Sequence, residues 1–225
     1  GKSIEQGPDM RRIFGKMEAI FDILYLAAAG TIGSLLLFSA DLSFPRLLAG
    51  AAAIFLTAGD AFHLLPRIHG AFTGKEEELK RALGRGKKIA SLTMTIFYLI
   101  LWHIGLLLYE PRRLLLLTFG VWMLAGLRTL LCLSSRNEWE ERYTSATWGI
   151  YRNIPFALQG FSVAGLYFFY RASTAGLDLM WLAILLSFAF YLPVVLWSNR
   201  YPKIGMLMLP KTCTYLWMLV MLLAL

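Results

Sequence analysis

Long apolar segments alternate with short charged ones along almost the whole chain. Seven of the apolar segments are long enough to cross a membrane, because a helix needs roughly 20 apolar residues to span a bilayer core of about 30 Å. They cover residues 17–40, 44–66, 89–110, 113–134, 152–171, 178–199 and 205–225. None shows a polar stripe along its whole length at helical period, as the helices of a soluble bundle would. The pattern therefore predicts an all-α polytopic membrane protein with seven transmembrane helices, which form a single domain over residues 10–225.

The first residues of the chain differ from the rest. Residues 1–9 precede the first methionine, Met10, and resemble a remnant of cloning, so we expect the folded domain to begin after them. A cleavable signal peptide is not predicted. The apolar run that starts near Met17 is longer than the apolar core of a signal peptide, which has roughly 7–15 residues.

Composition supports the membrane class. The sequence is 58% hydrophobic and 16% charged, whereas soluble domains are about 45–50% apolar and about 25% charged. The net charge of +8 does not indicate a nucleic-acid partner, because the basic residues lie between the apolar runs rather than among aromatic residues. Membrane lipids are therefore the expected partners, and the sequence leaves the oligomeric state open.

The basic residues also predict how the helices cross the membrane, since cytoplasmic connections of membrane proteins carry an excess of lysine and arginine. Fifteen basic residues lie on the side of the N-terminus: Lys2, Arg11, Arg12, Lys16, Arg67, Lys75, Lys80, Arg81, Arg85, Lys87, Lys88, Arg136, Arg142, Arg200 and Lys203. Four lie on the other side: Arg46, Arg112, Arg113 and Arg171. We therefore expect the N-terminus in the cytoplasm and the C-terminus outside. The short loops favour a multi-pass protein of the bacterial inner membrane.

Four of the predicted helices carry one charged residue each at a similar depth. Asp22, Asp60, Arg128 and Lys211 lie about five or six residues from the cytoplasmic ends of their helices, roughly 8–9 Å below the surface at 1.5 Å per residue. A charge at membrane depth costs about 2.5–3.5 kcal/mol on insertion scales, so each of them needs a partner or a function. We therefore predict a polar chamber near the cytoplasmic side of the membrane.

Further polar residues extend this predicted chamber. The second helix places on one face Thr57, Asp60, His63 and Arg67. The third helix has a comparable stripe of Ser91, Thr95, Tyr98 and Trp102. At the same level the fifth helix begins with Arg152 and Asn153, and the sixth ends at Asn199. Simpler alternatives stay open: Asp60 could pair with Arg128 or Lys211 between helices, Asp22 and Arg67 could extend to the interface, and His63 could be a packing residue.

The residue types in the predicted chamber suit hydrolysis of a lipid. Cleavage of an ester or vinyl-ether bond needs a proton donor and a group that activates water. Asp60 is the expected acid, with Asp22 or His63 as its partner. Substrate binding is expected from Arg128, Arg152, Lys211, Tyr98 and Arg67. No cofactor or metal ion is predicted, because Cys132 and Cys213 have no metal-binding spacing with histidine.

The stretch Ala58-Gly-Asp-Ala-Phe-His-Leu-Leu-Pro66 resembles the Gly-Asp motif of the YhhN/TMEM86 lysoplasmalogenase family. The resemblance implies a small polytopic membrane enzyme that hydrolyses the vinyl-ether bond of lysoplasmalogens. It also implies a second acidic residue on a late helix. The seventh helix carries Lys211 at that place, so Asp22 would have to take that role, and the long basic connection after Pro66 also departs from the family.

Two functions of other classes compete with a lipid hydrolase. A proton-coupled transporter of a small solute would use Asp60 and His63 as relay groups, but it needs polar residues that continue toward the outer side. Little besides Gln159 and Thr118 is available there. In the other alternative, the charged layer is only structural and holds the helices together.

Overall fold

The computed structural model describes residues 8–141 and 143–225. These residues form seven α-helices and no strand: α1 (Pro8–Phe38), α2 (Phe44–Thr73), α3 (Lys80–Tyr109), α4 (Leu115–Leu133), α5 (Ala146–Phe169), α6 (Met180–Trp197) and α7 (Met208–Leu222). Two short 3₁₀ helices, η1 (Ser135–Asn137) and η2 (Pro202–Leu207), precede α5 and α7. The predicted all-α fold of seven helices is confirmed. Most of the predicted cloning remnant, residues 1–9, lies outside the described residues.

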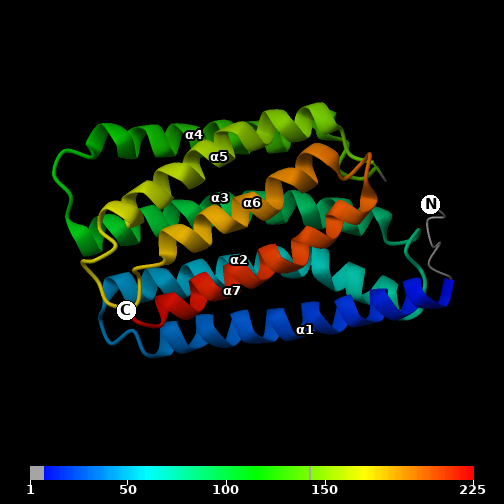
Figure 1. Ribbon diagram of the computed structural model, residues 1–225, viewed down its shortest axis with the longest axis horizontal. Helices are drawn as coiled ribbons and strands as arrows, with labels where there is room; N and C mark the ends of the chain where they lie inside the picture. Colours follow the sequence, from blue (N-terminus) through cyan, green and yellow to red (C-terminus); the bar gives the residue numbers. More distant parts are fainter. Residues whose placement is uncertain (1–7, 142) are drawn as a thin grey trace, which may run out of the picture.

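The helices form one elongated bundle in which consecutive helices run in opposite directions (Figure 1). The α2–α3, α4–α5 and α6–α7 connections lie at one end, which we call the basic end because most of the basic residues gather there. The C-terminus lies at the opposite end (Figure 1). The direction in which this bundle crosses a membrane stays a prediction from the distribution of charge.

Six stretches among the described residues are long and apolar enough to span a membrane, and they correspond to every helix except α5. Helix α5 is less apolar because it carries three buried polar residues, Arg152, Asn153 and Gln159. The outer surface of the bundle exposes many large apolar side chains, including Leu115, Leu116 and Phe169. Such a surface suits contact with lipid rather than water. The fold is that of a multi-pass helical membrane protein.

Helices α2 and α3 continue well beyond the boundaries that the sequence suggested. Helix α2 runs through Pro66 to Thr73 and ends at Gly74, whose left-handed backbone (φ 72°) lets its N–H donate to the carbonyl of Gly70. A proline inside a helix removes one backbone hydrogen bond. Close packing of α3 along this part of α2 supports the helix. Helix α3 begins at Lys80, nine residues before the apolar run 89–110 that predicted it.

Gly86 makes this close packing possible. A Cβ atom at this position would overlap the carbonyl of Phe62 and the Cα of His63, both backbone atoms of α2. Backbone atoms inside a helix cannot move aside as a flexible side chain can. The position of His63 relative to α3 therefore depends on this glycine.

We expect the substitution Gly86→Ala to lower the stability of the folded protein. Overpacking of this kind costs about 1–3 kcal/mol, which should appear as a lower melting temperature in detergent, followed by intrinsic fluorescence. Gly126→Ala is the matched control, because a Cβ at Gly126 meets no atom within 4 Å. The control should be neutral or stabilising by about 0.5–1 kcal/mol, since alanine favours a helix. Equal melting temperatures for both variants would contradict this packing account.

Candidate functional site

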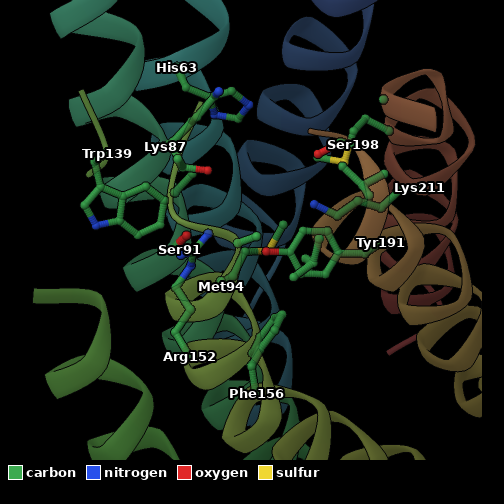
Figure 2. Close-up of a pocket in the computed structure, with 18 of the residues that line it drawn as sticks. His63, Lys87, Ser91, Met94, Trp139, Arg152, Phe156, Tyr191, Ser198 and Lys211 are labelled. Atoms are coloured by element: carbon green, nitrogen blue, oxygen red, sulfur yellow. The ribbon is translucent and has the colours of Figure 1, made fainter. Parts of the chain in front are cut away.

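A cavity of about 300 Å³ lies inside the basic end of the bundle and is lined by residues of α2, α3, α4, α5, α6 and α7. Its walls include residues of the α4–α5 and α6–α7 connections, so it lies next to the end of the bundle rather than at its centre. Figure 2 shows side chains from these elements converging on a shared space. We call this space the charged cavity.

Positively charged side chains dominate the lining of the charged cavity. Five helices each contribute one cationic side chain to the wall: Arg67, Lys87, Arg128, Arg152 and Lys211. Among the residues that line the cavity, Asp60 is the only carboxylate. The charged cavity is therefore strongly positive within an otherwise apolar bundle.

Asp60 lies in the wall beside α1. Its Oδ2 atom accepts a 2.6 Å hydrogen bond from the hydroxyl of Tyr25, which is buried between the helices. Gly59, the preceding residue, lies directly against the side chain of Thr93 on α3, where a Cβ would not fit without a shift. Within the described part of the chain Asp60 forms no ion pair, so the direct pairing with Arg128 or Lys211 that the sequence left open is not made.

Arg128 and Arg152 form a buried pair on the α4–α5 wall. The Nη1 atom of Arg128 donates to the Arg152 carbonyl at 3.0 Å and to Asn153 Oδ1 at 2.8 Å. The Nη1 atom of Arg152 donates to Asn137 Oδ1 at 3.0 Å. The two arginine side chains therefore bond only to neutral acceptors in the described structure.

Each of these arginines also keeps an unsatisfied donor. Arg128 is 1% exposed and Arg152 is 7% exposed, and the Nε atom of each is buried without a hydrogen-bond partner among the described residues. Their guanidinium groups lie over the rings of Phe156 and Trp139, each at 4.3 Å from the ring centre. A buried charge with no opposite charge beside it is costly. The pair has the properties of a site that an anionic ligand completes.

Asn137 holds the Arg152 side chain in place. Asn137 is fully buried, and its Nδ2 atom donates to the carbonyls of Leu131 and Ser134 at the end of α4. Its remaining polar atom, Oδ1, is the acceptor for Arg152. The end of α4 and the start of α5 are thus joined through one amide side chain.

His63 lies one helical turn after Asp60 and also lines the charged cavity. Its Nδ1 atom is buried and has no hydrogen-bond partner in the described structure. Arg67, a further turn along, is more exposed and forms a 2.8 Å ion pair with Glu18 on α1. His63 therefore has a free nitrogen, whereas the charge of Arg67 is already paired.

Lys211 reaches the cavity from α7 across two aromatic rings. Its Nζ atom lies 4.7 Å from the ring centre of Tyr191 and 5.3 Å from that of Tyr215. These contacts stabilise a cation without neutralising it. In Figure 2, Lys211 and Tyr191 approach the shared space from the side facing Lys87 and Arg152.

Two of the residues selected from the sequence lie outside the charged cavity. Asp22 is buried on α1, its Oδ2 atom has no partner among the described residues, and it does not line the cavity. Tyr98 is fully buried and hydrogen-bonds to Ser187 at 3.1 Å and to Tyr215 at 3.0 Å, but it also does not line the cavity. Asp60, His63, Arg67, Arg128, Arg152 and Lys211 are the selected residues that the structure brings together.

Several residues that line the cavity, or that hold a lining side chain as Asn137 does, were not selected from the sequence. Lys87 was assigned to a loop, yet it lies four residues before Ser91 and therefore continues the polar stripe of α3 by one turn. Trp139 and Asn137 lie in the α4–α5 connection, and nothing in the local sequence indicates that they enter the bundle. Tyr191 lies in a uniformly apolar segment and gave no signal as a cavity residue.

Together, the fold and the site define a multi-pass helical membrane protein with a positively charged cavity near one end of the bundle. Comparison with protein-family models, curated proteins and solved structures finds no match to the chain. The described residues contain no cluster of three or more histidine, cysteine, aspartate or glutamate side chains that could hold a metal ion.

Proposed function

We propose that this protein binds a phosphate-bearing lipid from the membrane in the charged cavity. The protein would then hydrolyse the carboxylic ester that joins the acyl chain to the phosphate-bearing part of the lipid. The observation that carries the proposal is the buried pair Arg128 and Arg152, which has neutral acceptors only and an unsatisfied Nε atom on each side chain. Arginine is well suited to phosphate, since its planar group offers several donors in a fixed geometry. A phosphate would supply the negative charge that this wall lacks.

The cavity's position supports a membrane lipid as the source of that phosphate. The cavity lies next to one end of an apolar bundle. If the bundle spans a bilayer, this end would lie where lipid headgroups meet the hydrocarbon region. Its volume of about 300 Å³ is at the small end of ligand sites, which hold about 300–1,000 Å³. A headgroup fits this space, while an acyl chain would stay in the bilayer.

Asp60 and His63 supply the acid and base for the proposed hydrolysis. His63, which lines the cavity, takes a proton from water, and the water oxygen bonds to the carbonyl carbon of the ester. The bond from this carbon to the alcohol oxygen then breaks, and protonated Asp60 gives that oxygen its proton. The products are a fatty acid and the phosphate-bearing alcohol, and transfer of a proton from His63 to Asp60 through solvent restores the site.

The alternatives receive less support from the same residues. A transporter needs a polar route beyond the cavity, but the interior next to it is filled by packed aromatic side chains such as Phe97, Tyr98 and Phe188. A purely structural charged layer would pair its cations with carboxylates, and Arg128 and Arg152 have none. The vinyl-ether cleavage implied by the Gly-Asp motif remains a variant of the proposal, since it needs the same acid and base.

Turnover of defined lipids by the purified protein tests the proposal. The panel contains lysophosphatidic acid, lysophosphatidylcholine, a lysoplasmalogen and a monoacylglycerol with the same acyl chain, and released fatty acid or aldehyde is quantified by mass spectrometry. We expect consumption of at least one phosphate-bearing lipid and none of the monoacylglycerol. No consumption of any lipid, or equal consumption of the monoacylglycerol, would contradict the proposal. If the protein carried a solute across proteoliposome membranes and consumed no lipid, transport would replace hydrolysis as its proposed function.

A further inference from the structure

Four of the five cations that line the charged cavity have no ion-pair partner among the described residues. Arg67 is paired with Glu18, but the described residues place no ion-pair partner beside Lys87, Arg128, Arg152 or Lys211. The single lining carboxylate, Asp60, accepts a hydrogen bond from Tyr25 and offsets one of these four charges at most. Among the described residues, the cavity therefore keeps a formal excess of three positive charges when Asp60 is ionised, and of four when Asp60 is protonated as the proposed acid.

The charge of a bound headgroup should match this excess. Arg128 and Arg152 lie in a poorly solvated interior, where charges interact strongly and are weakly screened by salt, whereas Lys211 is half-buried and Lys87 is exposed. A phosphate monoester carries about −1.5 to −2 charges at neutral pH. A choline or ethanolamine headgroup combines a phosphodiester with an ammonium group and is neutral overall, so it would leave the whole excess in place.

The aromatic rings of the cavity wall are already covered by cations of the protein, and its one carboxylate, Asp60, accepts a hydrogen bond from Tyr25, which leaves little to hold an ammonium group. Proteins bind choline on open aromatic faces or beside carboxylates. Here the ring of Trp139 is covered by Arg152, that of Phe156 by Arg128 and that of Tyr191 by Lys211. Cations of the protein already occupy the positions over these rings that an ammonium group would need.

Donors for a phosphate, by contrast, come from opposite walls. Figure 2 shows Arg152 and Lys87 on one side of the space and Lys211 and Tyr191 on the other. Ser91 adds a hydroxyl on the α3 wall. A tetrahedral phosphate presents oxygens in several directions at once, so it can accept from both walls.

From this arrangement we infer that the charged cavity selects a terminal phosphate monoester and rejects headgroups that carry an ammonium group. The inference rests on the proposed function and names its substrate class: single-chain lipids with a free phosphate, rather than the zwitterionic lysoplasmalogens that the Gly-Asp motif implied. Free inorganic phosphate shares the same chemistry and is the other source to be distinguished.

Equilibrium binding to the intact purified protein tests the inference. The probes are lysophosphatidic acid, lysophosphatidylcholine with the same acyl chain, and inorganic phosphate, measured by calorimetry in one detergent. We expect lysophosphatidic acid to bind at least about tenfold more tightly than lysophosphatidylcholine, because interactions between close buried charges dominate discrimination of this kind. Inorganic phosphate should compete for the same site with lower affinity.

Variants at the cavity wall make the test specific. Lys211→Met and Lys87→Met should each reduce the preference for lysophosphatidic acid severalfold, while Arg112→Gln, at the exposed α3–α4 connection, should leave it unchanged. Melting curves identify any variant that fails to fold. If Lys211→Met fails to fold, the preference for lysophosphatidic acid is tested with Lys87→Met alone.

The possible outcomes separate the inference from the proposed function. Equal affinity for the two lysophospholipids would overturn the inference and leave lipid binding intact. Absence of binding by every phosphate probe would overturn both. Tight binding of inorganic phosphate without any gain from the acyl chain would support selection of a free phosphate and overturn the membrane lipid as its source.

Discussion

Replacing Asp60 by asparagine should reduce lipid turnover by about 10²–10⁴-fold, the usual contribution of a positioned acid or base. Asparagine has the same shape as aspartate, and its carbonyl oxygen can still accept the hydrogen bond from Tyr25. The fold should therefore persist while the group that donates a proton to the leaving alcohol is lost. Turnover of the preferred lysophospholipid, followed by mass spectrometry of the products, measures the effect.

The matched control for Asp60→Asn is Asp178→Asn, at an exposed position of the α5–α6 connection. This variant should retain wild-type turnover and wild-type melting temperature. Equal turnover by the wild-type protein and by Asp60→Asn would exclude Asp60 as the acid, even if the lipid still binds. A loss of turnover with a collapsed melting curve would instead assign Asp60 to folding.

Arg152→Gln should weaken binding of lysophosphatidic acid by about 30-fold or more, since loss of one member of a buried charge pair costs roughly 2–5 kcal/mol. Glutamine removes the positive charge but can keep a hydrogen bond to Asn137 Oδ1, the partner of Arg152. Arg152→Lys is an informative second variant, because it retains the charge and loses the planar group that can hold two phosphate oxygens. Calorimetry of lipid binding measures both effects.

The stability of the ligand-free protein shows whether Arg152 serves ligand binding or folding. A buried cation without an opposite charge destabilises the folded state. Arg152→Gln should therefore melt at the same temperature as the wild-type protein, or higher, when no ligand is present. A marked fall in melting temperature together with unchanged lipid affinity would assign the guanidinium group a structural role and remove the main support for the proposed function.

The number of helices could be predicted from the sequence because the length of an apolar run is a property of the chain alone. The residues at which the helices begin and end were harder to predict from the sequence. Pro66 suggested an end to α2, but the helix continues because α3 packs against it through Gly86, a contact between segments that sequence spacing does not reveal. The early start of α3 at Lys80 has the same origin and explains why Lys87 was taken for a loop residue.

The level of the charged cavity along the helices could also be predicted, since depth follows from counting residues from a helix end. The direction in which each side chain points around its helix could not. Asp22 and Asp60 lie at a similar distance from the ends of their helices, yet Asp22 does not line the cavity. Helix α1 packs on the outer side of α2 and α7, at the edge of the bundle, and contributes no residue to the cavity wall (Figure 1). Tyr98 lies on the stripe of Ser91 but too deep to line the cavity.

The cavity residues that come from connections between helices and from apolar segments were the hardest to predict from the sequence. Trp139 and Asn137 reach Arg152 from the α4–α5 connection, and no periodic pattern exists there to show that they turn inward. The proposed headgroup selectivity depends on the rings beside Arg128, Arg152 and Lys211, and these rings come from three different elements. Selectivity of this kind depends on tertiary packing.

The most direct test of the charged cavity as a phosphate site is a crystal structure of the protein soaked with tungstate, a heavy mimic of phosphate. Anomalous scattering locates the anion without any assumption about the substrate. The account predicts one dominant peak inside the cavity, within hydrogen-bond reach of Arg152 and of Arg128 or Lys211. Peaks confined to the basic residues of the surface connections, with none among these three side chains, would contradict it.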